Sequence, residues 1–522
     1  MANNNYFKHG VASGDPLPSA VILWTRLTPT AESTAGSGKG PTAEVIWQVS
    51  ASKAFRSLVK SGTISATASR DHTIKFDVTG LKPSSDYYFR FRYEGVDSPT
   101  GRIRTAPEAG GSPSKLRFGV VSCANYQAGY FSAYRHLAAH SLDAVIHMGD
   151  YIYEYGDGEY GNGQGNKVIR PLQPSHEIKT LQDYRRRHAL YKTDPDLQTL
   201  HAAAPFICTW DDHESANDAY ADGAENHDPA TEGDWKARRA AAYRAYDEWM
   251  PIRMSGTTKV GDGSQIYRRL RFGRLAELSM LDLRTYRTAM GGAFALPVPD
   301  PDAEERKIAG DEQLGWLESG LKASGSQWKL IGNPVMIAPV LIPPLPNAIR
   351  EAIVDTEGLL PVDGVQYNTD QWDGYTRERR NLLEFIADHG VQDTVFLTGD
   401  IHSAWACDIP TKPGTYPLST TVATEFVCTS VTSNNLKDIT GTPARTTSVV
   451  VENLIKGANR HVRYLDFDNH GYSVLEVTPS RAQMDWYVIS DRADKSATVK
   501  HSTSWAVPAS TQRVEQTSNP IG

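Results

Sequence analysis

The 522-residue sequence contains only four cysteines, too few for a disulfide framework in a chain of this length. It also lacks an uninterrupted run of about 18 apolar residues, so we expect no transmembrane helix. Basic residues are not in excess: the net charge is -7 and the pI is about 6.1, which argues against specific nucleic-acid binding. With 40% hydrophobic and 22% charged residues, the composition indicates a globular protein of two domains, one of them large.

The cysteines divide by their surroundings. Cys208 and Cys428 lie within apolar runs, a pattern typical of thiols buried in a core. Cys123 follows an apolar run and precedes a polar one, so its position is different. A disulfide between Cys407 and Cys428 stays open, because spacing along the chain does not decide a pairing.

Residues 1–106 show the pattern of an all-β domain. Short runs of alternating hydrophobicity are separated by Gly, Pro and Ser clusters; they lie at 20–27, 44–49, 72–78 and 87–93. The segment Leu81–Tyr87 resembles the turn into a late strand of a fibronectin or immunoglobulin sandwich. A stretch rich in Pro, Gly and Ser follows, and it predicts a linker at 107–114.

The pattern changes from residue 115 onward, where strands alternate with helical periods. Strands are predicted at 116–122, 144–149, 205–210, 328–333 and 393–398. Helical stretches are predicted near 129–140, 234–249, 311–323 and 375–389, and 461–490 is rich in β-type residues. We therefore predict a layered catalytic domain of the α/β or α+β type over 115–522.

Four of these strands end in groups of potential metal ligands. The four segments are Ser122–Tyr126, Gly149–Tyr153, Trp210–Glu214 with Asn217 just after it, and Gly399–His402. Ligand sites in open α/β sheets form beyond the carboxyl ends of the strands. One Gly-Asp after a strand is often only a turn, but four such groups in order predict that their side chains converge.

The types of ligand indicate two kinds of metal. A thiolate, a carboxylate, a phenolate and an imidazole together suit trivalent iron, and the candidates are Cys123, Asp150, Tyr153 and His402. Harder oxygen ligands suit Ca²⁺, with Mn²⁺ or Mg²⁺ as substitutes, and the candidates are Asp212, Asn217 and Asp400. His213 is a candidate to protonate a leaving alkoxide. Asn125 is a candidate for binding phosphate, or else for capping the following helix.

These motifs, in this order, resemble those of calcineurin-like metallophosphoesterases, with two departures. The first motif reads Cys123-Ala-Asn125 in place of Asp-x-His, and the last reads Gly399-Asp-Ile-His402 in place of Gly-His-x-His. The departures resemble the PhoD family of alkaline phosphatases and phosphodiesterases, as does the N-terminal segment Phe7–Pro16. The resemblance implies an N-terminal immunoglobulin- or fibronectin-like β-sandwich, followed by a metallophosphoesterase β-sandwich flanked by helices.

The resemblance also implies a centre of one ferric ion with calcium, in one or two copies. Carried over by motif, Cys123, Asp150, Tyr153 and His402 would bind the iron. Asp150 would bridge to the calcium side, where Asp212, Asn217 and Asp400 are the candidates. Asp211 and Asp212 are alternatives here, because the sequence does not say which of the two carboxylates points inward.

The expected activity is hydrolysis of a small-molecule or lipid phosphoester by a metal-activated hydroxide, without a phosphoenzyme. The alternative within this family is an iron-dependent phospholipase D. The apolar segment Ala338–Pro346 would then touch a membrane surface or an acyl chain, although packing as a pocket wall explains it too. A more distant alternative is a non-catalytic surface-binding module with a structural metal. Tyr184–His188 carries three arginines, one of which could reach a phosphate, although such a run is usually a solvated helix face.

The first residues, Met1–Tyr6, lack the charged region and apolar stretch of a secretory signal. The residues by themselves fit either a cytoplasmic protein or an exported one whose targeting peptide has been removed. The family resemblance implies export through the twin-arginine route, so we expect a secreted protein, and we expect a monomer.

Overall fold

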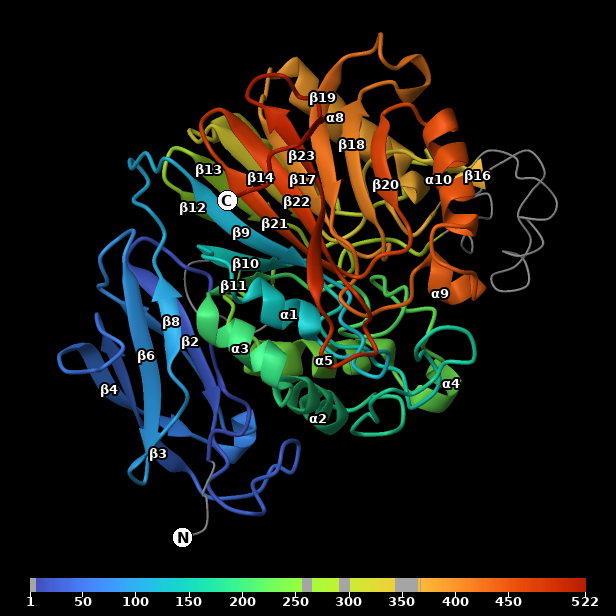
Figure 1. The fold of residues 1–522 in the computed structure, drawn as a ribbon. Coiled ribbons are helices and arrows are strands. Elements are labelled where there is room, and N and C mark those ends of the chain that lie inside the picture. The colour runs from blue at the N-terminus through green and yellow to red at the C-terminus, as the bar shows by residue number, and fades with distance from the viewer. Residues whose placement is uncertain (1–5, 256–264, 291–300, 343–364, 367) are drawn as a thin grey trace.

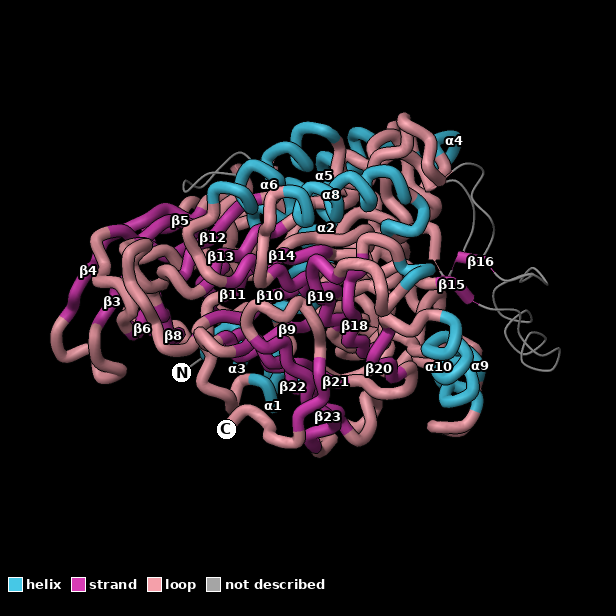
Figure 2. Tube along the Cα trace, turned by 90° about the horizontal axis from the view of Figure 1, so that it is seen from above, coloured by secondary structure: helices cyan, strands magenta, loops and turns pink. Residues whose placement is uncertain are grey.

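The computed structural model describes residues 6–255, 265–290, 301–342, 365–366 and 368–522. Two central β-sheets form the larger part of the molecule, and a third sheet from the N-terminal region lies to one side (Figure 1). Helices α9 (Leu436–Thr440) and α10 (Thr447–Ala458) lie at the end of the molecule away from that third sheet (Figures 1 and 2). In the described part of the chain, no helix is long and apolar enough to cross a membrane.

The first central sheet has ten strands in the order β24-β23-β22-β21-β9-β10-β11-β1-β2-β5. Its members are β1 (Val11–Gly14), β2 (Ala20–Arg26), β5 (Thr73–Thr79), β9 (Leu116–Val121), β10 (Ala144–His147), β11 (Phe206–Cys208), β21 (Gly471–Val477), β22 (Arg481–Ile489), β23 (Val499–Pro508) and β24 (Glu515–Thr517). Strands β9, β10 and β11 are parallel, so their carboxyl ends meet at one edge. Three of the four predicted ligand segments follow these strands.

The second central sheet has seven strands in the order β12-β13-β14-β17-β19-β18-β20. Its members are β12 (Arg268–Phe272), β13 (Ala276–Met280), β14 (Trp328–Asn333), β17 (Thr394–Thr398), β18 (Ala404–Pro410), β19 (Thr421–Val427) and β20 (Val462–Asp466). A core of large buried side chains joins the two sheets, including Phe118, Leu330 and Trp486. This face-to-face packing brings the end of β17 toward the ends of β9 and β10.

Helices cover the outer face of each sheet. On the first sheet they are α1 (Ser132–Leu137), α2 (Leu181–Lys192), α3 (Pro195–Ala203) and α5 (Trp235–Trp249), which share one core with β9, β10 and β11. On the second sheet they are α6 (Asp311–Ala323), α8 (Thr376–Asp388) and α10. The short α4 (Pro229–Glu232) lies in the connection that precedes α5. The larger part is thus a β-sandwich flanked by helices, as predicted.

The predicted helices over 234–249, 311–323 and 375–389 are confirmed within two residues. The helix predicted near 129–140 is shorter, because α1 begins only at Ser132. Before it, the Tyr130 amide donates to the Arg492 carbonyl at 2.7 Å, and a Cβ at Gly129 would lie 2.6 Å from that oxygen. The backbone there pairs with a distant segment, which prevents an earlier helix start.

The N-terminal sheet contains β3 (Ala43–Ser50), β4 (Leu58–Ala66), β6 (Asp86–Tyr93), β7 (Val96–Asp97) and β8 (Gly101–Arg104). It packs against β1, β2 and β5 around one apolar core, which gives the predicted N-terminal sandwich. Strand β1 also pairs in parallel with β11, so the first central sheet includes three strands from residues before the predicted 107–114 linker. Gly14 permits this approach, because a Cβ there would lie 2.6 Å from the Phe206 carbonyl oxygen.

Candidate metal centre

Cys123, Asp150, Asp212 and His402 follow the carboxyl ends of β9, β10, β11 and β17, where the two central sheets meet. Backbone hydrogen bonds fix the first two loops to each other. The Cys123 amide donates to the Gly149 carbonyl at 3.3 Å, and the Ala124 amide donates to the Asp150 carbonyl at 3.0 Å. Each of these loops therefore lies beyond the carboxyl end of a strand, as predicted.

Backbone strain is concentrated in these loops. Cys123, Asp150, Asp400 and His402 all have positive φ angles, between 49° and 65°. This left-handed region is costly for residues with a side chain, and it persists where surrounding structure enforces it, often at functional sites. Gly149, with φ of 102°, has no room for a side chain, because a Cβ would lie 2.7 Å from the Asp211 nitrogen. The fold thus holds four candidate ligands in conformations that they do not favour.

The first half of the site, which we call the thiolate side, consists of Cys123, Asp150, Tyr153 and His402. Donor atoms of Cys123, Asp150 and His402 all lie within 4.8 Å of one another. The Tyr153 hydroxyl donates to Asp150 Oδ2 at 2.9 Å and lies 3.5 Å from His402 Nε2. The structure therefore brings together all four side chains predicted as iron ligands.

Two residues that the sequence analysis did not single out support this half. The Ser433 hydroxyl donates to the Tyr153 hydroxyl oxygen at 2.6 Å. His402 Nδ1 donates to the Asn434 carbonyl at 2.7 Å, which leaves the lone pair of Nε2 facing the other ligands. A hydrogen bond of this kind fixes the tautomer and the ring orientation of a metal-binding histidine.

The thiolate side fits a bound cation. Burial raises the pKa of the Cys123 thiol well above its ordinary value, and the neighbouring Asp150 raises it further. Burial likewise raises the pKa values of Asp150 and Tyr153. Asp150 Oδ1 is buried and accepts no hydrogen bond from the described residues. A positive ion at this point would hold the three acidic groups ionised and would satisfy the free oxygen.

The second half, which we call the carboxylate side, consists of Asp212, Asp218, Asp370 and Asp400. Carboxylate oxygens of Asp212, Asp218 and Asp370 lie within 4.8 Å of one another, and Asp212 also forms such a group with Asp150 and His213. Burial raises the pKa of Asp218 to about 8, and the charges of Asp370 and Asp212 add to this effect. Two sets of acidic groups therefore adjoin through Asp150 and Asp212.

Two buried arginines, Arg284 and Arg287, contact the carboxylate side. Arg284 lies 2.8 Å from an Asp370 oxygen, 3.5 Å from Asp400 and 3.7 Å from Asp212, and it also pairs closely with Asp211. Arg287 lies 2.5 Å from Asp370. Burial opposes ionisation of Asp370, but the two guanidinium groups outweigh it and lower the pKa of that carboxyl.

The structure distinguishes Asp211 from Asp212, between which the sequence left a choice. The Asp211 carboxylate faces Arg284, whereas Asp212 is the one whose oxygen approaches Asp150, Asp218 and Asp370. The side-chain nitrogen of Asn217 donates to Glu225 Oε2 at 3.2 Å. Its role as a ligand stays a prediction.

His213 lies between the two sides. Its Nδ1 bonds Glu154 Oε2 at 2.7 Å, and its ring packs against the Tyr153 ring with centroids 4.2 Å apart. Burial by itself would lower the pKa of His213, but the charges of Asp212, Glu154 and Asp150 raise it well above the ordinary value. These carboxylates therefore favour the protonated imidazole, the form that a general acid requires.

The Asn125 side chain is held by its own loop. Its Nδ2 donates to the Tyr160 carbonyl at 2.8 Å, and its Oδ1 accepts from the Gln127 amide at 3.2 Å. It does not cap α1, which begins at Ser132. Its predicted contact with phosphate stays a prediction.

The arginine run at 184–188 lies on α2, and its three guanidinium groups have different surroundings. Arg185 pairs with Glu248 at 2.7 Å, and Arg186 is exposed. Arg187 is fully buried and donates to the Tyr155 carbonyl at 2.9 Å and to the Tyr153 carbonyl. Only Arg187 therefore contacts a candidate ligand, and it does so through the backbone.

Some of the site residues that were not predicted could have been found from their positions in the sequence. Arg284 and Arg287 follow β13 in the segment Leu281–Arg287, so the same strand-end rule would have pointed to them. Asp370 follows no long strand, and Ser433 and Asn434 lie in an irregular segment after β19. Their proximity to the site depends on tertiary packing.

The chain is similar to known proteins along most of its length. The profile of the PhoD-like phosphatase family matches residues 118–486, and that of the PhoD-like phosphatase N-terminal domain matches residues 1–107. Alkaline phosphatase D of Bacillus subtilis (strain 168) is 36% identical over 485 residues, which cover 92% of this chain and 77% of that protein.

A solved structure titled "Structure of PhoD" superposes with a TM-score of 0.86 at 33% sequence identity. The match covers 100% of this chain and 94% of that one, and it confirms the predicted fold class. Because a family profile matches more than half of its length and a relative shares 36% identity, the chain belongs to the PhoD-like phosphatase family.

Proposed function

We propose that this metal-dependent phosphoester hydrolase works with ferric iron on the thiolate side and calcium on the carboxylate side. The observation that carries the proposal is the convergence of Cys123, Asp150, Tyr153 and His402 at one point beside a second, all-oxygen cluster. The activity class is that of the family, and the similarity to alkaline phosphatase D supports it along most of the chain.

The choice of iron rests on the donor set. Thiolate and phenolate carry negative charge to the ion, and together with a carboxylate they balance a trivalent cation. Cys123, Asp150 and Tyr153 supply these three charges, and His402 completes the set through Nε2. His402 and Asp400 are partly exposed, so the side of the centre at which they lie is open to solvent and substrate.

The choice of calcium rests on the oxygen ligands of the carboxylate side. Calcium takes six to eight oxygen ligands in flexible geometry, and Mn²⁺ or Mg²⁺ can use similar ones. Asp212 and Asp400 are the ligands we propose, with Asp150 shared between the two ions and Asn217 as a predicted addition. Asp218 and Asp370 lie close enough to take part.

When bound, cations held by the two sides would polarise a phosphoryl oxygen and activate a water for attack on phosphorus. The protein's own part is positioning and proton transfer. Glu154 accepts hydrogen bonds from the Asn217 amide at 2.7 Å and the Asn226 side chain at 2.9 Å, and so holds the His213 ring in place. His213 then protonates the leaving oxygen, while Asn125 stays a candidate for contact with the phosphate.

A second candidate activity is phospholipase D cleavage of a lipid headgroup. In the apolar segment 338–346, Ala338 and Val340 are buried in the core beside the second central sheet, whereas Leu341 is 51% exposed. Leu341 belongs to β15 (Leu341–Ile342), which pairs with β16 (Val365–Gln366) and contacts α10, where Val450 is also exposed. Residues 343–346 lie outside the described part. These exposed apolar side chains favour contact with a lipid surface.

A comparison of rates on p-nitrophenyl phosphate, bis-p-nitrophenyl phosphate and phosphatidylcholine tests both activities on one preparation. We expect turnover of the first two, stopped by chelators and restored by added metal. Faster turnover of phosphatidylcholine than of either soluble ester would assign the lipid activity instead. Transphosphatidylation in the presence of an added alcohol would contradict direct attack by water.

Replacement of the thiol tests the metal assignment. We expect Cys123→Ala to lose its iron, because one of the four proposed iron ligands is removed. We expect its turnover to fall by at least about 100-fold as a result. Cys407→Ala is the matched control, since Cys407 is an equally buried free thiol in the core of the second sheet. A folded Cys123→Ala protein with full turnover and full iron content would overturn the assignment. Absence of turnover in the iron-loaded wild type would favour a surface-binding module.

A further inference from the structure

The Ser122 hydroxyl lies between two cysteine sulfurs. Ser122 directly follows β9, and its Oγ lies 3.1 Å from the sulfur of Cys123 and 3.4 Å from the sulfur of Cys428. All three residues are fully buried. Cys428 is a free thiol, as are the other three cysteines, so it contacts Ser122 as a hydrogen-bonding group and not as half of a disulfide with Cys407.

The backbone fixes this contact where the two central sheets meet. The Ser122 carbonyl accepts a hydrogen bond from the Val431 amide at 3.1 Å. Cys428 directly follows β19, and its amide donates to the Thr398 carbonyl at the end of β17 at 2.9 Å. Gly399 leaves room for the serine, because a Cβ there would lie 2.8 Å from Ser122 Oγ. The hydroxyl is therefore enclosed by segments of both sheets.

The charge on Cys123 decides the direction of its hydrogen bond with Ser122. As a neutral thiol, Cys123 can donate to Ser122 Oγ or to the Asp400 carbonyl, which lies 3.7 Å from the sulfur. As a thiolate that binds a cation, it has no proton and can only accept. In the described part of the chain, the Ser122 hydroxyl is the one donor within hydrogen-bond distance of this sulfur. The serine therefore donates to Cys123 once the thiol has ionised.

Cys428 extends this hydrogen bond into a chain of three groups. Burial raises the pKa of the Cys428 thiol to about 12, so it keeps its proton. The oxygen of Ser122 can accept from that thiol while its own proton points to Cys123, because a hydroxyl is both donor and acceptor. Consecutive hydrogen bonds polarise one another, and they are stronger where water is excluded.

We propose, on the basis of the ferric centre proposed above, that Ser122 is a positioning residue that donates a hydrogen bond to the Cys123 thiolate and is supported by the Cys428 thiol. A hydrogen bond to a thiolate withdraws negative charge from the sulfur, so the sulfur donates less charge to the iron. The ferric ion keeps more of its positive charge for the phosphoester, and its reduction potential is raised.

The visible charge-transfer band that a thiolate gives ferric iron tests this role, together with the reduction potential of the iron. Ser122→Ala removes the donor, so the filled sulfur orbitals rise in energy. We expect the band to move to longer wavelength, the potential to fall, and iron affinity to decrease about tenfold. Cys428→Ala removes only the far partner, so the band should move in the same direction by a smaller amount. A merely structural role would lower iron affinity but leave the band and the potential of the iron-loaded protein unchanged.

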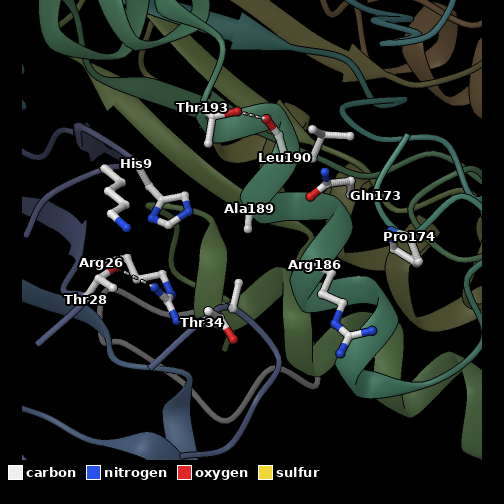
Figure 3. Close-up of a pocket in the computed structure, with 12 residues that line it drawn as sticks. His9, Arg26, Thr28, Thr34, Gln173, Pro174, Arg186, Ala189, Leu190 and Thr193 are labelled. Carbon is white, nitrogen blue, oxygen red and sulfur yellow. Dashed lines mark hydrogen bonds between the residues drawn. The ribbon is translucent and has the colours of Figure 1, made fainter. Parts of the chain in front are cut away.

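Three control variants should keep the wild-type band and potential. Ser473→Ala changes a buried serine of β21, the strand that pairs with β9, and its hydroxyl has no hydrogen-bond partner among the described residues. Thr28→Val removes a buried hydroxyl that accepts from Arg26 at 3.0 Å, in a pocket beside helix α2 and outside the metal centre (Figure 3). Cys407→Ala removes a buried thiol of the core beside the second sheet.

The possible failures are distinguishable. An unchanged band and potential in iron-loaded Ser122→Ala would overturn the role of Ser122 and leave the ferric assignment intact, as would equal shifts in Ser122→Ala and Ser473→Ala. If Ser122→Ala does not fold, Cys428→Ala decides, and an unmoved band in that variant would overturn the proposed chain. A wild-type protein that binds no iron would overturn the ferric assignment and the role of Ser122 with it.

Discussion

On the carboxylate side, Arg284 and Arg287 offset part of the negative charge of the four carboxylates, whereas no lysine or arginine among the described residues pairs with Cys123 or Asp150 on the thiolate side. The carboxylate side therefore has two cationic partners within the fold, which the thiolate side lacks. The thiolate side has buried acidic groups, one free carboxylate oxygen and strained backbone, all of which favour a bound cation. We infer that a metal on the thiolate side is required for that half to ionise, while a metal on the carboxylate side adds to a network that already exists.

The largest effect is expected where the two sides meet. Asp150→Asn removes the carboxylate that approaches the ligands of both sides, so we expect turnover to fall by at least about 1,000-fold, with loss of both metals. Metal analysis and steady-state rates on bis-p-nitrophenyl phosphate measure the two effects. Asp408→Asn is the control, because Asp408 is a buried carboxylate bonded to Tyr416 at 2.7 Å and takes no part in the site. Loss of only one metal in Asp150→Asn would show that the two sides do not share this ligand.

His213 lies between the two sides and is the proposed proton donor, so its replacement tests the proton-transfer step. His213→Gln should slow hydrolysis of alkyl esters by about 100-fold and of p-nitrophenyl esters by much less, since a good leaving group needs no proton. The raised pKa of His213 means that the ring keeps its proton to a higher pH than an ordinary imidazole and loses it as the pH rises further. The wild-type rate on alkyl esters should therefore decline on the alkaline side, and the variant should lack that decline. An equal loss on both ester types would contradict the role as an acid.

Removal of a support on the thiolate side should have a smaller effect. Ser433→Ala removes the hydrogen bonds to the Tyr153 hydroxyl and to the Cys123 carbonyl, and we expect iron affinity to fall about tenfold with turnover restored by excess iron. Competition with a chelator measures the affinity. Ser326→Ala is the control, because Ser326 is a buried serine that bonds the Gly273 carbonyl away from the site. Unchanged iron affinity would show that the hydroxyl does not position the phenolate.

The smallest effect on iron is expected from the carboxylate side. Arg284→Met should leave iron content unchanged but destabilise the calcium-free protein by about 3 kcal/mol, because buried aspartates lose their partner. Added calcium should restore much of that stability. In the control Arg268→Met, which breaks a buried pair with Asp15 outside the site, calcium should give no such rescue. Denaturant unfolding with and without calcium measures the difference, and equal rescue of both variants would contradict the comparison.

The extent to which sequence predicts this site also differs between the two sides. The thiolate side follows from strand ends, because each ligand lies within six residues of a regular strand whose apolar pattern is evident. The carboxylate side does not: Asp218 and Asp370 lie in irregular segments, and only tertiary packing brings them to Asp212. The sequence likewise predicts α5, α6 and α8 from their period, but not α2, α3 or α10. It also does not predict the pairing of β1 with β11, which joins segments almost 200 residues apart.

The most direct test of the central claim is the visible absorption of the purified protein, read together with its iron content. Thiolate and phenolate ligands give ferric iron a charge-transfer band in the visible range. We expect one iron per chain and a band that shifts or disappears in Tyr153→Phe, while Tyr464→Phe, a tyrosine of β20 outside the site, keeps it. A fully active protein without iron and without the band would contradict the account.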